Sequence, residues 1–254
     1  MRTPISFVNG RGLTLRGFIF EPQKFKNAVI FLHGFPSSCQ GKTAPRLAEA
    51  LEKKGYLVLI FDFSHSSASD GKFEEKLMSR EVEDIRYAVN FLEDNYPYEH
   101  LTLVGHSTGA IDAALYAHQD KRIDRLVLMG GVSDLKHAVR YDFTDEQVHN
   151  FWKRGYILLK SKEPAWWEGK KLKKAFYDEF FTLDIPSALK RWKKPLLIVH
   201  GEKDEAVPLR EAEELLAQVN SPKRLVIIRE ADHRFSQERH FQKVIKVLHR
   251  FCKK

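Results

Sequence analysis

The sequence predicts an α/β fold in which a mainly parallel sheet carries helices on both faces. Short apolar runs alternate with segments of helical periodicity along most of the chain. Several of these runs are apolar throughout, as expected of strands that are covered on both faces. In addition, the motif Gly105-His106-Ser107-Thr108-Gly109 joins one such run to a helical segment. Strands and helices in this order form a parallel sheet, whose sites gather at the carboxyl ends of its strands.

The elements of the first half follow in chain order. Residues 13–20 alternate like a half-buried strand, and residues 28–32 form a continuous apolar run. A helix is expected over about 43–54, where Gly55 ends it, and 56–61 is the next buried strand. A second helix is expected over 81–95, because its apolar residues recur at helical spacing: Val82, Ile85, Val89 and Leu92.

The second half repeats the alternation. The Gly-x-Ser-x-Gly motif lies between an apolar run at 101–104 and a helical segment at 110–117. Further strands are expected at 126–130, 196–200 and 224–228, with helices at 210–219 and 241–251. There is no internal repeat and no low-complexity segment.

Residues 134–194 interrupt this alternation. They contain no expected buried strand but hold all four tryptophans and many other aromatic residues. We expect residues 1–133 and 195–254 to form the core domain and 134–194 to form an inserted helical lid over the carboxyl edge of the sheet. Most lid aromatics are expected to pack the lid onto the body. Trp152, Trp166 and Trp167 are the lid residues expected to contact a substrate.

Length and composition agree with one globular domain of 254 residues, 43% of them hydrophobic. No apolar run approaches the roughly 18–20 residues that span a bilayer, and the first residues lack the apolar region of a signal peptide. Cys39 and Cys252 lie far apart and belong to no metal-type cluster. We therefore expect a cytoplasmic protein without a metal.

The net charge is +8, and most of it comes from the expected lid. Two clusters stand out there: Lys170, Lys171, Lys173 and Lys174, and then Lys190, Arg191, Lys193 and Lys194. One interpretation is a solvated surface in a lysine- and glutamate-rich protein. The other is attraction to anionic substrates or to an anionic membrane surface. No nucleic-acid motif accompanies the charge, so we expect no nucleic-acid partner.

The strand–motif–helix order around Ser107 describes a nucleophile elbow. The turn is so tight that side chains at Gly105 and Gly109 would collide with neighbouring backbone, and it exposes the serine hydroxyl at its tip. A serine hydroxyl becomes a good nucleophile only when a base removes its proton and an acid orients that base. An ordinary strand-to-helix turn would have the same five residues, so the remaining chain must supply these partners.

Both partners follow expected strands. Asp204 comes just after the strand at 196–200, and His233 comes after the strand at 224–228. The order serine, aspartate, histidine is the one that a nucleophile elbow requires. Glu202 and Glu205 are weaker candidates for the acid. His106 is expected to pack beside the motif and to contribute to the substrate site.

Attack by such a serine on a carbonyl group would create an oxyanion, which also needs two hydrogen-bond donors. The backbone N–H of Thr108, which follows the nucleophile, is one. The other is expected from the loop after the strand at 28–32, where Gly34 lets the backbone turn inward and the amide of Phe35 can donate. Pro36 has no N–H. His33 and Gly34 are expected to line the substrate site.

Together these residues resemble the α/β-hydrolase superfamily, over nearly the whole chain. Within it the sequence is similar to feruloyl (cinnamoyl) esterases and monoacylglycerol-lipase-like enzymes. The segments that carry the resemblance are 33–35, 61–63, 69–73, the elbow, 201–204 and 232–235. The resemblance implies an α/β-hydrolase fold, hydrolysis of a small-molecule carboxylic ester without metal or organic cofactor, and a lid that shapes the acyl site.

The sequence departs from the family pattern at one loop. After residues 61–63 the family commonly has a Gly-His-Gly-type loop, whereas residues 64–68 here read Ser-His-Ser-Ser-Ala. Two lost glycines remove easy access to positive φ, so the path of this loop is open.

Four functions compete on the sequence. The first is an esterase for apolar or aromatic acyl groups, in which Ser107 forms an acyl-enzyme. The second is a lysophospholipase or monoacylglycerol lipase whose basic lid attracts lipid head groups. The third is a serine peptidase or thioesterase, since acyl-transfer enzymes share the triad. The fourth is a non-catalytic binding protein on the same fold.

Overall fold

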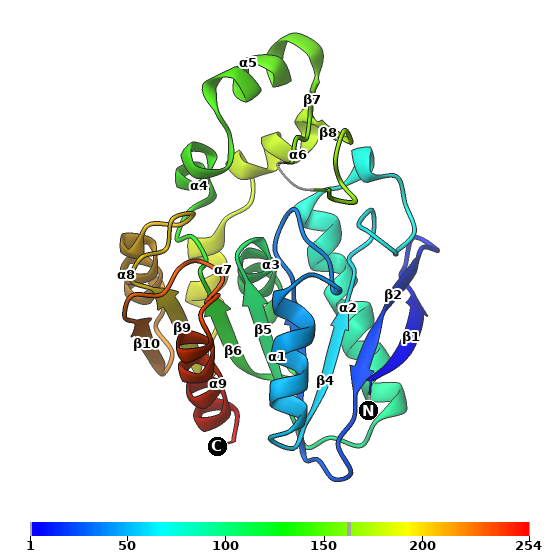
Figure 1. Ribbon diagram of the computed structural model, residues 1–254, viewed down its shortest axis with the longest axis vertical. Helices are drawn as coiled ribbons and strands as arrows, with labels where there is room; N and C mark the ends of the chain where they lie inside the picture. Colours follow the sequence, from blue (N-terminus) through cyan, green and yellow to red (C-terminus); the bar gives the residue numbers. More distant parts are fainter. Residues whose placement is uncertain (1, 162–163, 254) are drawn as a thin grey trace.

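The computed structural model describes residues 2–161 and 164–253, so residues 162 and 163 of the expected lid lie outside the described part. One sheet of eight strands forms the centre (Figure 1). In spatial order its strands are β1 (Arg2–Val8), β2 (Thr14–Phe20), β4 (Tyr56–Phe61), β3 (Asn27–Leu32), β5 (His100–His106), β6 (Ile123–Met129), β9 (Leu196–Gly201) and β10 (Lys223–Ile228). β1 and β2 are antiparallel to their neighbours, and the other pairs are parallel.

Helices cover both faces of the sheet. One face carries α1 (Thr43–Glu52) and α9 (Glu238–Cys252). The other carries α2 (Met78–Asn95), α3 (Thr108–Ala117), α7 (Ile185–Arg191) and α8 (Leu209–Gln218). Alternate side chains of one strand therefore enter different cores: Ile30 of β3 packs on the α2 and α3 side, and Phe31 on the α1 side. The predicted mainly parallel sheet with helices on both faces is confirmed.

The apolar runs of the sequence became strands close to their expected bounds. β4 covers 56–61 as predicted, and all six of its residues are buried. Several helices begin before their expected starts, as does α2 at Met78, whereas α1 begins at Thr43 as predicted. No helix in residues 2–161 and 164–253 is long and apolar enough to cross a membrane. Cys39 and Cys252 are both buried and free.

The segment between β6 and β9 lies largely above the sheet in Figure 1. It contains α4 (Leu135–Asp142), α5 (Asp145–Arg154), β7 (Tyr156–Leu158), β8 (Lys171–Lys173), α6 (Lys174–Asp178) and the short 3-10 helix η2 (Glu179–Phe181). We call residues 135–181 the insertion. The following helix α7 packs on α3 of the body.

The antiparallel ribbon of β7 and β8 was not predicted. Its strands have three residues each, which is too short for an alternating pattern to stand out from the surrounding helices. Ile157 of β7 and Leu172 of β8 are paired and buried, and they form the inner face of the ribbon. The expectation of helices alone in this segment was therefore incomplete.

The loop that departs from the family pattern keeps a left-handed backbone without the glycines. His65 has φ of 64° and Ser67 has φ of 43°. Hydrogen bonds hold this path: the His65 amide donates to the Asp70 carbonyl at 2.8 Å, and the Ala68 amide donates to Asp62 at 3.2 Å. A non-glycine residue at positive φ is strained, because its Cβ crowds the backbone.

We expect Ser67→Gly to stabilise the protein. Ser67 is exposed, so the change removes backbone strain and little else, and we expect the free energy of unfolding to rise by about 1 kcal/mol. Urea denaturation at neutral pH measures it. The matched control is Ala68→Gly at the next exposed position, where φ is not positive and glycine should lower stability. Equal losses in both variants would show that the turn stores no strain at Ser67.

Candidate active site

Ser107 lies in the turn between β5 and α3, with φ of 57° and ψ of −125°. Its amide donates to the Met129 carbonyl at the end of β6, at 2.9 Å. The turn needs glycine on both sides: a Cβ on Gly105 would overlap the Gly109 carbonyl, and a Cβ on Gly109 would overlap the Leu32 carbonyl. The strained turn that the motif predicts is therefore present, and it places Ser107 at the amino end of α3.

The structure brings Asp204 and His233 together. The ring Nδ1–H of His233 donates to Asp204 Oδ2 at 2.8 Å, and Oδ1 of the same carboxylate accepts from the amides of Ala206 and Val207. Burial on its own would raise the pKa of Asp204. The hydrogen bond and charge of His233 and the Val207 amide outweigh burial, so this pKa lies below its ordinary value. The carboxylate therefore stays ionised and holds His233 in one tautomer.

Two further histidines support this pair. His106 is buried, its Nε2–H donates to the His233 carbonyl at 2.9 Å, and the two ring centroids are 4.8 Å apart. Burial, aided by the charge of His233, lowers the pKa of His106 to about 3, so its ring is neutral. His200, at the end of β9, is fully buried and donates to the Val207 carbonyl at 2.9 Å. Both rings contact the His233–Asp204 pair and help to hold it in place.

The loop after β3 lies directly against Ser107. A Cβ on Gly34 would be 2.8 Å from Cβ of Ser107, so only glycine allows this approach. His33 is buried beside it, with Nδ1 2.9 Å from the Gly34 carbonyl. Within residues 2–161 and 164–253, the amides of Phe35 and Thr108 have no recorded acceptor. Both amides could therefore donate to an oxyanion, and this role stays a prediction.

The three predicted substrate-binding tryptophans lie in different places. Trp166 is half-buried and packs edge-on against Phe73, with ring centroids 5.6 Å apart. Trp167 is also half-buried and packs on the core. Trp152 is 69% exposed on α5, where Lys174 lies 4.0 Å from its ring centroid. Trp166 is therefore linked through Phe73 to Phe35 of the loop beside Ser107, whereas Trp152 lies on the outer surface.

Sequence reasoning missed Asp142, the last residue of α4. It lines a small cavity of about 10 Å³ together with Ser107, Thr108 and Tyr141. Asp142 itself is exposed to solvent, although protein atoms crowd around its carboxyl group. This crowding raises its pKa to about 6 against the opposing effect of His233. One aspartate among the many charged residues of the insertion carries no signal of its own in the sequence.

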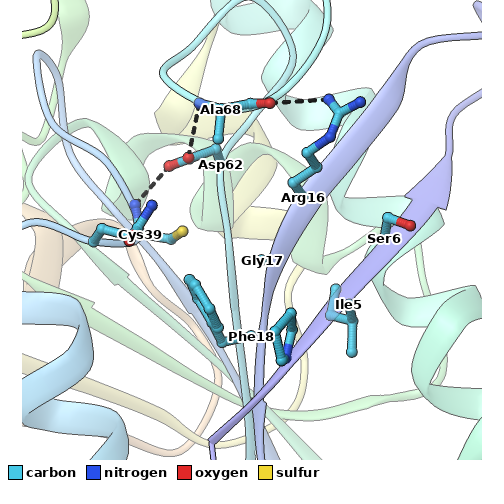
Figure 2. Close-up of a pocket in the computed structure, with 10 residues that line it drawn as sticks. Ile5, Ser6, Arg16, Gly17, Phe18, Cys39, Asp62 and Ala68 are labelled. Atoms are coloured by element: carbon cyan, nitrogen blue, oxygen red, sulfur yellow. Dashed lines mark hydrogen bonds between the residues drawn. The ribbon is translucent and has the colours of Figure 1, made fainter.

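A larger cavity of about 400 Å³ lies on another part of the sheet, beside β1 and β2 (Figure 2). Its polar groups bond to one another: Arg16 donates to the Ala68 carbonyl, and Asp62 accepts from the amides of Cys39 and Ala68. The cavity contacts none of the predicted catalytic residues. We therefore place the candidate active site at Ser107.

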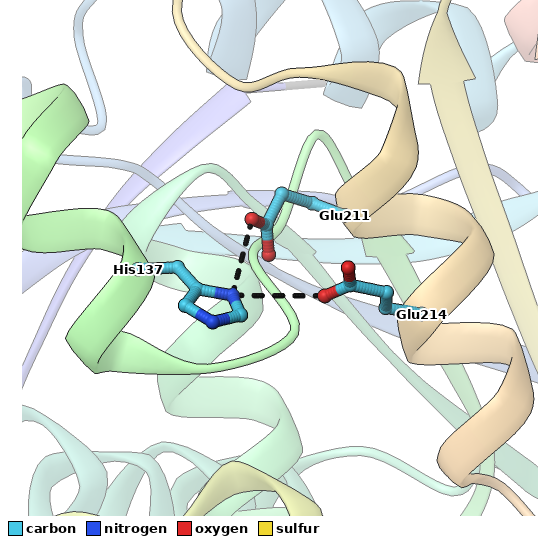
Figure 3. Close-up of side chains that lie close together, drawn as sticks. All are labelled: His137, Glu211 and Glu214. Atoms are coloured by element: carbon cyan, nitrogen blue, oxygen red, sulfur yellow. Dashed lines mark ion pairs between the residues drawn. The ribbon is translucent and has the colours of Figure 1, made fainter.

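The insertion is fastened to the body beside this site. Glu211 of α8 is fully buried and accepts hydrogen bonds from Ser133 and from Tyr141 of α4. The ring Nδ1 of His137, also on α4, lies 3.5 Å from a carboxylate oxygen of Glu211 and 3.6 Å from one of Glu214 (Figure 3). Burial would raise the pKa of Glu211, but the Ser133 hydrogen bonds outweigh it, so the pKa is lowered. These contacts fix the end of α4 that carries Asp142.

A strained serine lies between a parallel strand and a helix, and a histidine–aspartate pair comes from the loops after β9 and β10. These features define a hydrolase of the α/β-hydrolase fold. The chain belongs to the family described as serine aminopeptidase, S33, whose model matches residues 23–240.

Curated relatives are distant. The chain is 26% identical over 250 residues to palmitoyl-protein thioesterase ABHD10, mitochondrial, of Rattus norvegicus, covering 93% of this chain and 78% of that protein. It is 24% identical over 268 residues to the uncharacterized peptidase YuxL of Bacillus subtilis. That match covers 96% of this chain but 37% of YuxL, so the chain spans little more than a third of that protein.

Solved structures share the fold. Est1E from Butyrivibrio proteoclasticus, with ferulic acid bound, matches with a TM-score of 0.81 and 22% identity, over 97% of both chains. The esterase domain of a Rhodothermus marinus protein matches with a TM-score of 0.74 and 23% identity, over 99% of this chain and 97% of that one.

Proposed function

We propose that this protein is a serine carboxylesterase that cleaves esters of apolar or aromatic acyl groups through an acyl-enzyme on Ser107. The observation that carries the proposal is the ionised Asp204 hydrogen-bonded to His233, on the loops that follow the neighbouring strands β9 and β10. The strained turn of Ser107 adjoins this pair through His106, whose Nε2–H donates to the His233 carbonyl. This arrangement supplies a nucleophile, a base and an orienting acid in the chain order of α/β-hydrolases.

The reaction proceeds in two halves. His233 takes the proton of the Ser107 hydroxyl while its oxygen attacks the ester carbonyl, and the negative charge of Asp204 stabilises the imidazolium. The amides of Phe35 and Thr108 donate to the oxyanion of the tetrahedral intermediate. His233 then gives its proton to the leaving alcohol. In the second half, water attacks the acyl-enzyme with His233 as base and releases the acid.

Aromatic side chains that begin at the oxyanion loop favour an apolar or aromatic acyl group. The ring of Phe35 lies 6.2 Å from that of Phe73 and 5.1 Å from that of Phe176, and Trp166 packs on Phe73. The cavity at Ser107, however, has only about 10 Å³, whereas drug-sized ligands occupy about 300–1,000 Å³. We therefore expect the insertion to act as a lid that moves when the acyl group enters.

Thioester hydrolysis is the second candidate, because ABHD10 proteins are named palmitoyl-protein thioesterases and the same triad serves both reactions. Lipid esters, as cleaved by a monoacylglycerol lipase or lysophospholipase, remain a third. A peptidase is the least favoured of these alternatives.

A fluorophosphonate probe tests the chemistry, since it reacts with activated serines. We expect wild-type protein to be labelled on the peptide that contains Ser107, and to hydrolyse p-nitrophenyl esters and methyl ferulate faster than a palmitoyl thioester or an aminoacyl anilide. Absence of labelling in folded protein would refute the serine-hydrolase assignment. A preference for the thioester would replace the esterase proposal by the second candidate.

The position of Asp142 leads to a prediction about the charge of the acyl group that the enzyme accepts. With a pKa near 6 its carboxylate is mostly ionised at pH 8 and should repel an acyl group that carries its own carboxylate. The test substrate is a monoester of a dicarboxylic acid, whose acyl group carries a free carboxylate. We expect Asp142→Asn to raise kcat/KM for this substrate about tenfold at pH 8, which corresponds to about 1.4 kcal/mol of transition-state free energy. The gain should be much smaller at pH 5. Methyl ferulate, a neutral ester, is the reference substrate.

The matched control is Asp145→Asn, an exposed aspartate in the first turn of α5. It removes the same charge from the insertion at a residue that does not line the cavity at Ser107. An equal gain in both variants, or a gain independent of pH, would show that Asp142 does not select against anionic acyl groups.

A further inference from the structure

The outward face of the β7–β8 ribbon combines exposed lysines with an exposed apolar side chain. Because side chains of a strand alternate between faces, Ile157 and Leu172 face inward while their neighbours face outward. Two cross-strand pairs make the outer face, Leu158 opposite Lys171 and Tyr156 opposite Lys173. Leu158 is 49% exposed, and both lysines are exposed.

The adjoining end of α5 extends this face. Trp152, Lys153 and Arg154 are all exposed there and lead through Gly155 into β7. Within residues 2–161 and 164–253 the large hydrophobic side chains recorded as exposed are few, and Trp152, Leu158 and Phe181 all belong to the insertion. Exposed apolar side chains that gather on one face with polar residues around them are typical of surfaces that bind a partner or a membrane.

Most of the cations on this face have no acidic partner. In the described part of the chain, ion pairs are recorded only for Lys173, with Glu74 at 3.8 Å, and for Lys174, with Asp178. We define the basic ribbon surface by its exposed or half-exposed residues: Trp152, Lys153, Arg154, Tyr156, Leu158, Lys160, Lys171 and Lys173.

The second basic cluster of the sequence, residues 190–194, lies away from the ribbon, and two of its lysines donate hydrogen bonds to backbone carbonyls. The ammonium of Lys194 donates to the carbonyls of Lys121 and Ile123 near the start of β6, and the ammonium of Lys193 donates to the Lys190 carbonyl. The starts of parallel strands are the edge opposite the candidate active site. The structure therefore separates the two clusters and leaves only the first one combined with exposed apolar side chains.

We propose that the basic ribbon surface docks this protein on an anionic lipid bilayer. Lysine and arginine near such a surface contribute about 1 kcal/mol each, and tryptophan prefers the level of the lipid head groups. Leu158 and Trp152 then enter the interface while the surrounding cations meet phosphate and carboxylate head groups. The chemistry also favours lipid over nucleic acid, because a phosphodiester backbone offers no apolar layer to cover Leu158.

Docking in this way turns the insertion toward the bilayer. The insertion also carries Asp142, which lines the cavity at Ser107, so an ester drawn from the membrane would meet the site beneath it. The docking itself requires no catalysis and stands apart from the proposed function: binding to vesicles can fail while esters are still hydrolysed, and the reverse.

Vesicle sedimentation with the full chain tests the proposal. We expect binding to phosphatidylcholine vesicles that contain about 30% phosphatidylserine to exceed binding to pure phosphatidylcholine at least about tenfold at 0.1 M salt, and to fall about tenfold at about 0.5 M salt. Lys153→Glu/Lys171→Glu should lower binding at least about tenfold. Leu158→Ala should weaken binding a few-fold and keep its salt dependence.

The matched control is Lys190→Glu/Lys193→Glu, which changes the charge equally in the second cluster and should leave vesicle binding unchanged. Hydrolysis of a soluble p-nitrophenyl ester verifies that each variant is folded. Equal binding to neutral and anionic vesicles, or equal losses in the two charge-reversal variants, overturns the proposal. Salt-sensitive binding of a DNA duplex without vesicle binding also overturns it and assigns the surface to nucleic acid.

Discussion

Asp204→Asn will lower kcat for a p-nitrophenyl ester by about 10⁴, and Ser107→Ala will lower it by about 10⁶. Asparagine keeps the shape of the side chain but can present an amide N–H to His233 Nδ1, which favours the wrong tautomer and removes the charge that stabilises the imidazolium. Alanine removes the nucleophile. The double variant should lose little more than Ser107→Ala, because the residues act as a unit.

Glu205→Gln is the control that identifies the acid. Glu205 lies next to Asp204 in sequence and also bonds to His233, but it accepts from the backbone amide at 3.1 Å and not from the ring. We expect this variant to keep kcat within a few-fold of wild type. A loss near 10⁴ with Glu205→Gln and a small loss with Asp204→Asn would reverse the assignment. Initial rates and fluorophosphonate labelling provide the two measurements.

The second large effect concerns a buried acid that the reaction does not use. Asp112 of α3 is fully buried, and neither of its carboxylate oxygens has a hydrogen-bond partner within the described residues. Burial, followed by the nearby carboxylate of Glu81, raises its pKa well above the usual range, and Lys76 opposes this rise. Glu179 and Asp84 also face it and add negative charge, whereas Lys76 is already paired with Glu81.

We expect Asp112→Asn to stabilise the protein at neutral and alkaline pH. The pKa of Asp112 is higher in the folded than in the unfolded chain, so folding binds a proton. The contribution of Asp112 to stability is therefore full below the ordinary aspartate pKa of about 4, and it is lost progressively as pH rises toward the folded value. Asparagine has no such titration, so the variant avoids a loss of about 1.4 kcal/mol for each pH unit between about 4 and the folded pKa.

Urea denaturation across pH 5 to pH 9 measures the gain, which should be largest at the alkaline end. Asp94→Asn is the matched control, because Asp94 is exposed on α2 and its replacement should change little at any pH. A loss of stability with Asp112→Asn at pH 8 would show that the carboxylate is ionised and paired in the folded chain, contrary to the geometry described above.

Local sequence patterns were sufficient to predict an element wherever that element is long and its surroundings are uniform. β3, β4 and β9 lie in the middle of the sheet, so both of their faces are apolar and their runs are visible in the sequence. The ribbon of β7 and β8 was invisible because three residues hold no period, and Tyr156 and Lys173 meet only after the chain turns back. His65 and Ser67 show the opposite case, in which tertiary hydrogen bonds keep a backbone path that their residue types disfavour.

By itself the sequence determined the fold class and the candidate triad, because strand ends, glycines and one serine, aspartate and histidine are local features in a required order. Only the tertiary structure decided which charges meet. It placed Asp142 at the cavity beside Ser107, isolated Asp112 in the core, and separated the basic ribbon surface from the lysines near β6. Contacts between residues far apart in the chain depend on how helices and loops pack over the sheet, and no local pattern encodes that packing.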